Sequence, residues 1–169
     1  MPQLCEMRSL LFILALICYT SVFSQVDTAA PYFKERKLPA FTLLDKDSVA
    51  FDQDVLQKGK PTIVMLFNPE CDHCQQQLDL LLGMYEVSRC NLVMSSVETV
   101  LKNKDFYEKN RLDKYHFIYL GKDFKYILGK YFRPTSIPVL AVYNEKNEFV
   151  DIHYGNASKK VVLKMLAGQ

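Results

Sequence analysis

The chain has 169 residues, of which 49% are hydrophobic and 24% charged, and its formal net charge is +2. The lysines are interspersed with acidic residues, and no basic stripe carries interleaved aromatic side chains, so nothing indicates a nucleic-acid partner. The sequence also lacks repeats, low-complexity tracts and blocks of like charge. This composition is typical of one globular domain that is long enough to bury a sizeable core.

The N-terminal segment has the layout of a secretory signal peptide. Arg8 precedes an unbroken apolar run over residues 10–19, and Val22 and Ser24 suit the −3 and −1 positions of a cut after Ser24. The run is shorter than the roughly 20 residues that a membrane-spanning helix needs. We therefore expect residues 1–24 to be removed, the protein to be periplasmic or secreted, and no stable membrane span to remain. An uncleaved N-terminal anchor is the alternative.

The rest of the chain divides into a short leader and one domain. Residues 25–36 are a polar leader, and residues 37–169 form the predicted domain. The domain opens with a strand over residues 41–44, followed by a turn at 45–48 that has the sequence DKDS.

The next predicted elements are a buried strand and an amphipathic helix. Residues 62–67, TIVMLF, are a continuous apolar run rich in β-branched side chains and bounded by Pro61 and Pro69. Such a run fits a central strand that is covered on both faces. After it the spacing changes to that of a helix, whose apolar positions are Cys74, Leu78, Leu81, Leu82 and Tyr85.

Strands and helices alternate through the second half of the sequence. Strands are expected over residues 91–97, 115–120, 136–144 and 147–155, and helices over residues 101–112, 122–132 and 157–166. The alternation implies parallel pairing of the early strands, and a turn at residues 144–147 makes the last two strands an antiparallel pair. The predicted fold is an α/β sandwich with a mixed central sheet.

Three cysteines remain when the predicted signal peptide is removed. Cys5 and Cys18 fall within that peptide, which leaves Cys71, Cys74 and Cys90. A cysteine at the start of a helix meets unpaired backbone N–H groups and the positive end of the helix dipole, and a CxxC motif there favours thiolate over thiol. We expect Cys71 to be the attacking nucleophile, with its sulfur toward solvent. Cys74, inside the first turn and partly covered, would be the resolving thiol.

Three neighbouring residues are predicted to tune this redox couple. A protonated His73 would place a positive charge near the Cys71 thiolate, stabilise the reduced form and make the disulfide a stronger oxidant. Asp72 and Glu70 are anions beside the same sulfur and act in the opposite direction. The direction of electron flow is therefore left open.

The order of these elements resembles the thioredoxin superfamily. The strand TIVMLF, then NPECDHC, then an amphipathic helix, and far downstream TSIPVLAVYN match a fold in which a pair such as Ile137–Pro138 carries a cis-proline facing the CxxC. The stretch LPAFTLLDKDSVAF further resembles the opening hairpin of the TlpA-like and peroxiredoxin-like (AhpC/TSA-type) branch, which contains secreted or membrane-tethered thiol–disulfide oxidoreductases of bacteria. The resemblance covers about residues 37–166.

The resemblance implies a fold, an activity and partners. The fold would be a thioredoxin-like three-layer α/β sandwich. The activity would be disulfide exchange with protein substrates that carry disulfides or thiols, without a cofactor, and a separate redox partner would regenerate the CxxC. The substrate chain would lie along the Ile137 backbone and Pro138.

The sequence departs from the family pattern at three positions. Glu70 stands where thioredoxins commonly have Trp, and the chain contains no Trp. Met65 stands where many members bury an acid that accepts the proton of the resolving thiol. Asn68 stands three residues before the first cysteine, where a peroxiredoxin has Thr, so peroxidase activity is not expected.

The CxxC has three alternative interpretations. A structural zinc site takes four ligands. Apart from the CxxC, the predicted mature chain offers no second cysteine pair at zinc-ribbon spacing. The other candidate ligands are His73, which lies between the two cysteines and is awkwardly placed, and the single residues Cys90, His116 and His153, so no metal is expected. A structural disulfide across so short a loop adds little stability. The third alternative is a binding module that keeps the fold without turnover.

The remaining candidate residues are assigned to the core or to strands. Cys90 is expected to be a small buried hydrophobe, and His116 and His153 ordinary strand residues. Most aromatic residues of the second half are expected in the core: Tyr115, Phe117, Tyr119, Phe124, Tyr126, Tyr131 and Phe132. The alternative for Tyr131, Phe132 and Arg133 is the rim of a peptide-binding groove next to Pro138.

Overall fold

The structure, a computed structural model, describes residues 29–168. The predicted signal peptide and the first residues of the leader lie outside this range. The described residues form a seven-stranded sheet in the order β2-β1-β5-β4-β3-β6-β7. The strands are β1 Thr42–Leu44, β2 Ala50–Asp52, β3 Thr62–Leu66, β4 Asn91–Ser96, β5 Ile118–Lys122, β6 Val139–Tyr143 and β7 Phe149–Tyr154.

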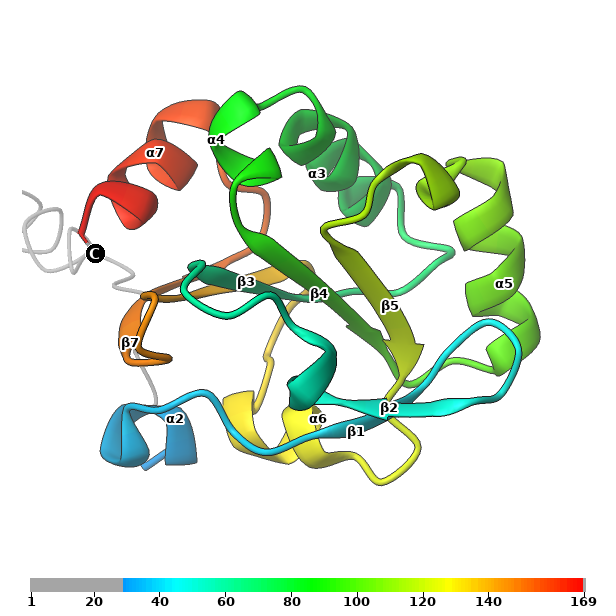
Figure 1. Ribbon diagram of the computed structural model, residues 1–169, viewed down its shortest axis with the longest axis horizontal. Coiled ribbons are helices and arrows are strands. Elements are labelled where there is room, and N and C mark those ends of the chain that lie inside the picture. Colours follow the sequence, from blue (N-terminus) through cyan, green and yellow to red (C-terminus); the bar gives the residue numbers. More distant parts are fainter. Residues whose placement is uncertain (1–28, 169) are drawn as a thin grey trace, which may run out of the picture.

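Helices cover both faces of this sheet (Figure 1). They are α2 Pro31–Glu35, α3 Asp72–Leu82, α4 Tyr85–Ser88, α5 Val100–Lys109, α6 Ile127–Phe132 and α7 Lys159–Ala167, with short 3-10 turns at Gln53–Val55 and Leu112–Lys114. Helices α3, α4, α5 and α7 pack on one face, and α2 and α6 pack on the other. The molecule is therefore a three-layer α/β sandwich, as expected.

Strand β3 lies inside the sheet, between β4 and β6, and is buried along its whole length. Because successive side chains of a strand point to opposite faces, Ile63 and Met65 join the core under α3 and α5, whereas Val64 and Leu66 join the core under α6. The continuous apolar run in the sequence follows from this burial on two sides.

The pairing of the strands confirms the predicted mixed sheet. Strands β3, β4 and β5 are parallel, and β6 and β7 form an antiparallel pair. Strand β6 is also antiparallel to β3, with Val139 opposite Leu66. The start of β6 therefore lies at the same edge of the sheet as the end of β3.

Two predicted helices are shorter than expected. The helix after the CxxC ends at Leu82, and Gly83 caps it, because glycine is a weak helix former. Tyr85 begins the separate helix α4 and is 74% exposed, so its assignment to the buried helix face was wrong. The helix predicted over residues 122–132 begins only at Ile127, after a turn that Asp123 holds.

The leader contributes to the domain core. Residues 31–35 form α2, and Tyr32 is fully buried against the rings of Phe132 and Phe149, at centroid distances of 6.0 and 5.4 Å. Packing therefore begins before the domain boundary that we expected at residue 37. Within residues 29–168, no helix is both long enough and apolar enough to cross a membrane.

Candidate functional site

The CxxC stands at the start of α3. Cys71 is the N-cap residue, and its carbonyl oxygen accepts hydrogen bonds from the N–H groups of Cys74 and Gln75 at 3.0 and 3.1 Å. Cys71 is partly exposed, whereas Cys74 is 0% exposed inside the first turn. The structure therefore places the two cysteines as the sequence predicted, with one thiol accessible and the other covered.

The surroundings of Cys74 keep its thiol protonated. Burial raises the pKa of Cys74 to about 12, although a hydrogen bond with the Asn68 backbone acts in the opposite direction. Met65 lies fully buried in β3, at the position expected for an acid, and its thioether cannot take a proton. A resolving attack by Cys74 therefore depends on a proton acceptor other than residue 65.

Asn68 holds the loop that leads from β3 to Cys71. Its side-chain oxygen accepts the Glu70 N–H at 2.8 Å, and its backbone oxygen accepts the Cys71 N–H at 3.1 Å. Its amide nitrogen donates to Glu98 Oε1 at 3.1 Å, just after β4. Sequence reasoning considered Asn68 only as the residue that replaces a threonine. The sequence does contain a signal for this turn, because the dipeptide Asn68–Pro69 favours a turn.

Glu70 lies at the rim of the site and has a cationic partner. Its side chain is 66% exposed, and its Oε2 is 2.7 Å from Lys102 Nζ. Lys102 also contacts Glu98 at 3.1 Å, and these two carboxylates raise the pKa of the lysine. Lys102 of α5 thus offsets part of the negative charge of Glu70, while Glu98 adds a second carboxylate to the same cluster.

His73 and Asp72 are both exposed in the first turn of α3. Asp72 is placed where a negative charge interacts favourably with the helix dipole. His73 Nδ1 lies 3.4 Å from the side-chain nitrogen of Asn156, a residue that follows β7. Sequence reasoning missed Asn156, because it is 83 positions away and lies in no recognisable motif.

The peptide bond between Ile137 and Pro138 is cis, as the resemblance implied. Pro138 immediately precedes β6, whose first residue pairs with the last residue of β3. Since the chain runs from that end of β3 to Cys71, the proline and the CxxC lie at the same edge of the sheet. Ile137 is partly buried against the core cluster that also contacts Cys71.

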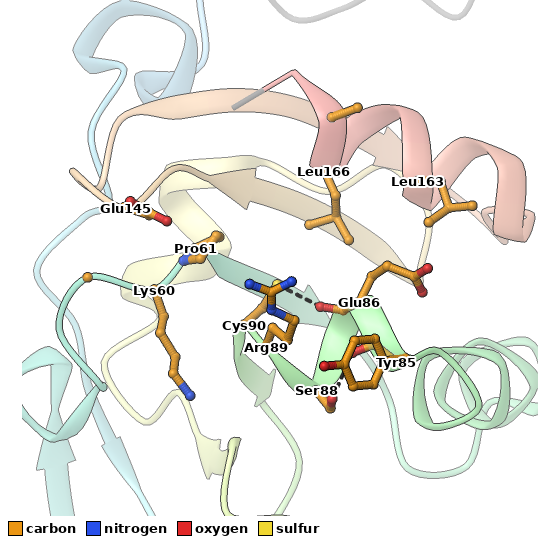
Figure 2. A pocket seen from close by; sticks show the side chains of 12 residues that line it. Lys60, Pro61, Tyr85, Glu86, Ser88, Arg89, Cys90, Glu145, Leu163 and Leu166 are labelled. Atoms are coloured by element: carbon orange, nitrogen blue, oxygen red, sulfur yellow. Dashed lines mark hydrogen bonds between the residues drawn. The ribbon is translucent and has the colours of Figure 1, made fainter.

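Cys90 lies at the opposite edge of the sheet. It immediately precedes β4, whose first residue pairs with Thr62 at the start of β3. A cavity of about 680 Å³ opens beside it, between α4, α7 and the chain before β3 (Figure 2). The lining is mixed, with Lys60, Arg89, Glu86, Glu145, Leu163 and Leu166 among its residues.

The Cys90 thiol itself is buried, and burial favours its protonated form. It is 3% exposed, it lies 3.4 Å from the Glu86 carbonyl oxygen, and burial raises its pKa to about 11. These findings confirm the prediction of a small buried hydrophobe.

We predict that iodoacetamide modifies Cys71 long before Cys90. With a pKa of about 11, only about one Cys90 thiol in a thousand is ionised at pH 8, and burial slows its reaction further. The modification rate of Cys90 should rise about tenfold per pH unit between pH 8 and 10, as its thiolate fraction does. Peptide mass spectrometry over time measures both rates, and equal rates at pH 8 would contradict the prediction.

The structure confirms some of the remaining core and strand assignments and contradicts others. His153 lies in β7, but His116 lies in a turn before β5, so its assignment to a strand was wrong. Tyr131 and Phe132 are buried, which confirms the core assignment, whereas Phe124 and Tyr126 are 42% and 50% exposed. Among residues 29–168, no three His, Cys, Asp or Glu side chains gather as a metal site.

Comparisons with known proteins identify the fold. No family model matches the sequence, and no curated protein is similar to it. A secreted disulfide oxidoreductase of Mycobacterium tuberculosis superposes with a TM-score of 0.61 at 18% identity, covering 76% of this chain and 96% of its own. The exposed lipoprotein thioredoxin Etrx1 of Streptococcus pneumoniae superposes with a TM-score of 0.59 at 18% identity, covering 78% and 100%. The chain has the thioredoxin fold.

A third solved structure has the same fold but is named neither a disulfide oxidoreductase nor a thioredoxin. Peroxidoxin BcpB of Mycobacterium tuberculosis superposes with a TM-score of 0.61 at 18% identity, covering 78% of this chain and 92% of its own. Because one fold carries several activities, the function has to be argued from the CxxC and its surroundings.

Proposed function

We propose that this protein is a thiol–disulfide oxidoreductase that exchanges disulfides with protein substrates outside the cytoplasm. The observation that carries the proposal is the pair of thiols at the start of α3, with Cys71 accessible and Cys74 buried behind it. The fold shared with a secreted disulfide oxidoreductase supports it. The predicted signal peptide supports export, and disulfide exchange suits an oxidising compartment.

The proposed cycle uses the two thiols of this chain, a proton acceptor for Cys74 and an external thiol partner. The Cys71 thiolate attacks one sulfur of a substrate disulfide and forms a mixed disulfide, while the other substrate sulfur leaves as a thiolate. Cys74 then gives up its proton and attacks Cys71 Sγ, which closes the Cys71–Cys74 disulfide and releases the second substrate sulfur. The substrate gains two electrons and two protons. A regenerating thiol partner reduces the couple again, and the reverse sequence oxidises a substrate.

Ile137 and Pro138 are proposed to hold the substrate chain. Strand β6 begins its pairing with β3 and β7 only at Val139, so the Ile137 backbone lies outside that ladder. An extended substrate segment could pair with it beside Cys71. Pro138 has no backbone N–H to donate.

The proposal is tested by equilibrating the protein with mixtures of reduced and oxidised glutathione and measuring the fraction of free thiols. We expect one two-electron transition that is absent in Cys71→Ser and unchanged in Cys90→Ser. A potential near about −270 mV would indicate a reductant and one near about −120 mV an oxidant. The absence of any transition in the wild-type protein would contradict the proposal and favour a binding module without turnover.

A further inference from the structure

Gln77 is a buried polar residue on the helix that carries the CxxC. It lies one turn after Cys74 and is 2% exposed. Its Oε1 accepts the Ala157 N–H at 2.6 Å, in the loop after β7, and this bond is buried. Its Nε2 has no hydrogen-bond partner within the part of the chain that the structure describes. Because a buried amide is costly unless it is hydrogen-bonded, the bond to the loop is what keeps Gln77 in the core.

The same loop is bonded to the cis-proline. The Gly155 N–H donates to the Pro138 carbonyl oxygen at 2.7 Å, which extends the pairing of β6 with β7 by one step. Gly155 has a φ of +81°, a left-handed conformation that favours glycine over other residues. Residues 155–157 therefore connect Pro138 to α3, the two parts of the proposed site.

The relative position of these two parts matters for the proposed reaction. Cys71 stands at the start of α3, whereas the Ile137 backbone and Pro138 precede β6. A substrate segment that pairs with Ile137 must present its disulfide to Cys71 at the same time. A misplacement of about 1 Å is enough to slow such an oriented reaction strongly.

We propose that Gln77 is a positioning residue that holds the 155–157 loop, and through it the Pro138 backbone, at the distance from Cys71 that an extended substrate chain requires. The bond from Ala157 joins the loop to α3, and the bond from Gly155 joins it to Pro138. This inference rests on the proposed disulfide exchange, because it concerns how a substrate disulfide is placed at Cys71.

The test compares two mixed disulfides that share the leaving group thionitrobenzoate. One is formed with the cysteine of a short unstructured peptide, and the other with mercaptoethanol, which has no peptide backbone. In both, the Cys71 thiolate attacks the aliphatic sulfur and thionitrobenzoate leaves as a thiolate, since the thiol of lower pKa is the better leaving group. Absorbance of the released thionitrobenzoate gives both second-order rate constants. The wild-type protein should react faster with the peptide disulfide.

Two variants loosen the two ends of the loop. Gln77→Met keeps a side chain of similar length and removes the oxygen that accepts the Ala157 N–H. It should lower the rate constant for the peptide disulfide about two- to tenfold, as expected for the loss of one hydrogen bond, and leave that for the mercaptoethanol disulfide unchanged. Gly155→Ala adds a Cβ at a positive φ and should act in the same direction. It decides the question if Gln77→Met does not fold.

Gln75→Met is the matched control on the same helix. The Gln75 amide donates to Asp79 and Asn110, away from the loop, so both rate constants should equal those of the wild-type protein. An unchanged peptide rate in either folded loop variant would overturn the inference while the proposed function stands. So would an equal fall with both disulfides, or a wild-type protein that does not favour the peptide. A wild-type protein that reacts with neither disulfide would overturn both.

Discussion

Cys74→Ser is expected to accumulate mixed disulfides with protein substrates, whereas Cys71→Ser is expected to accumulate none. Cys71 is partly exposed at the start of α3, so we expect its sulfur to be the one that meets a substrate disulfide. Cys74 is 0% exposed, and burial raises its pKa to about 12, so it presents almost no accessible thiolate to a protein. Without Cys74, the bond between Cys71 and the substrate has no internal thiol to resolve it.

The measurement is electrophoresis without reducing agent after each variant is incubated with a disulfide-containing protein. Bands of added mass that vanish on reduction should form with Cys74→Ser only. Cys90→Ser provides the matched control, since it also removes a buried thiol but at the far edge of the sheet. Equal trapping by both CxxC variants, or by neither, would contradict the assignment of nucleophile and resolving thiol.

The parts of the fold that depend on local pattern were predictable from the sequence. The run TIVMLF is apolar from its second residue on, as expected for a strand such as β3 that is buried on both faces. The CxxC followed by helical spacing placed Cys71 outside and Cys74 inside, since that assignment depends only on the helix start. The cis bond at Ile137–Pro138 followed from the resemblance and not from any local property of the residues.

The polar contacts around the site were not predictable, because their partners are distant in the sequence. Lys102 reaches Glu70 across 32 positions, and Asn156 reaches His73 across 83. Single polar residues carry no periodicity that would relate two such positions. The sign of the charge near Cys71 could therefore not be worked out from Glu70, Asp72 and His73 alone.

The packing of Tyr32 against the core was not predictable for a related reason. A short segment with several charged residues indicates a solvated chain, yet one aromatic ring can anchor it when an apolar surface is available. Tyr32 finds that surface on α6 and β7, two elements that lie more than ninety positions later in the chain. The composition of a segment is an average over its residues, so it does not reveal that one side chain, Tyr32, packs into the core.

Asp123→Ala is expected to lower the free energy of unfolding by about 3 kcal/mol. The Asp123 side chain is 3% exposed, and its carboxylate accepts the N–H groups of Ile127 and Leu128 at 2.8 Å and of Gly129 at 3.2 Å. These are the first donors of α6, which have no partner within the helix. Removing the acceptor leaves them unpaired in a largely buried place, and urea denaturation monitored by circular dichroism measures the cost.

Two comparison variants determine whether the lost hydrogen bonds are the cause. Asp123→Asn keeps one side-chain oxygen as an acceptor, so it should lose less stability than Asp123→Ala. Asp151→Ala removes an exposed carboxylate that accepts the neighbouring Ile152 N–H, and it should change the free energy by less than about 0.5 kcal/mol. If Asp123→Ala lowered the free energy of unfolding no more than Asp151→Ala does, the N–H groups at the start of α6 would not depend on the Asp123 carboxylate.

Because α6 packs on the face of the sheet opposite α3, Asp123→Asn should leave the redox potential of the Cys71–Cys74 couple unchanged.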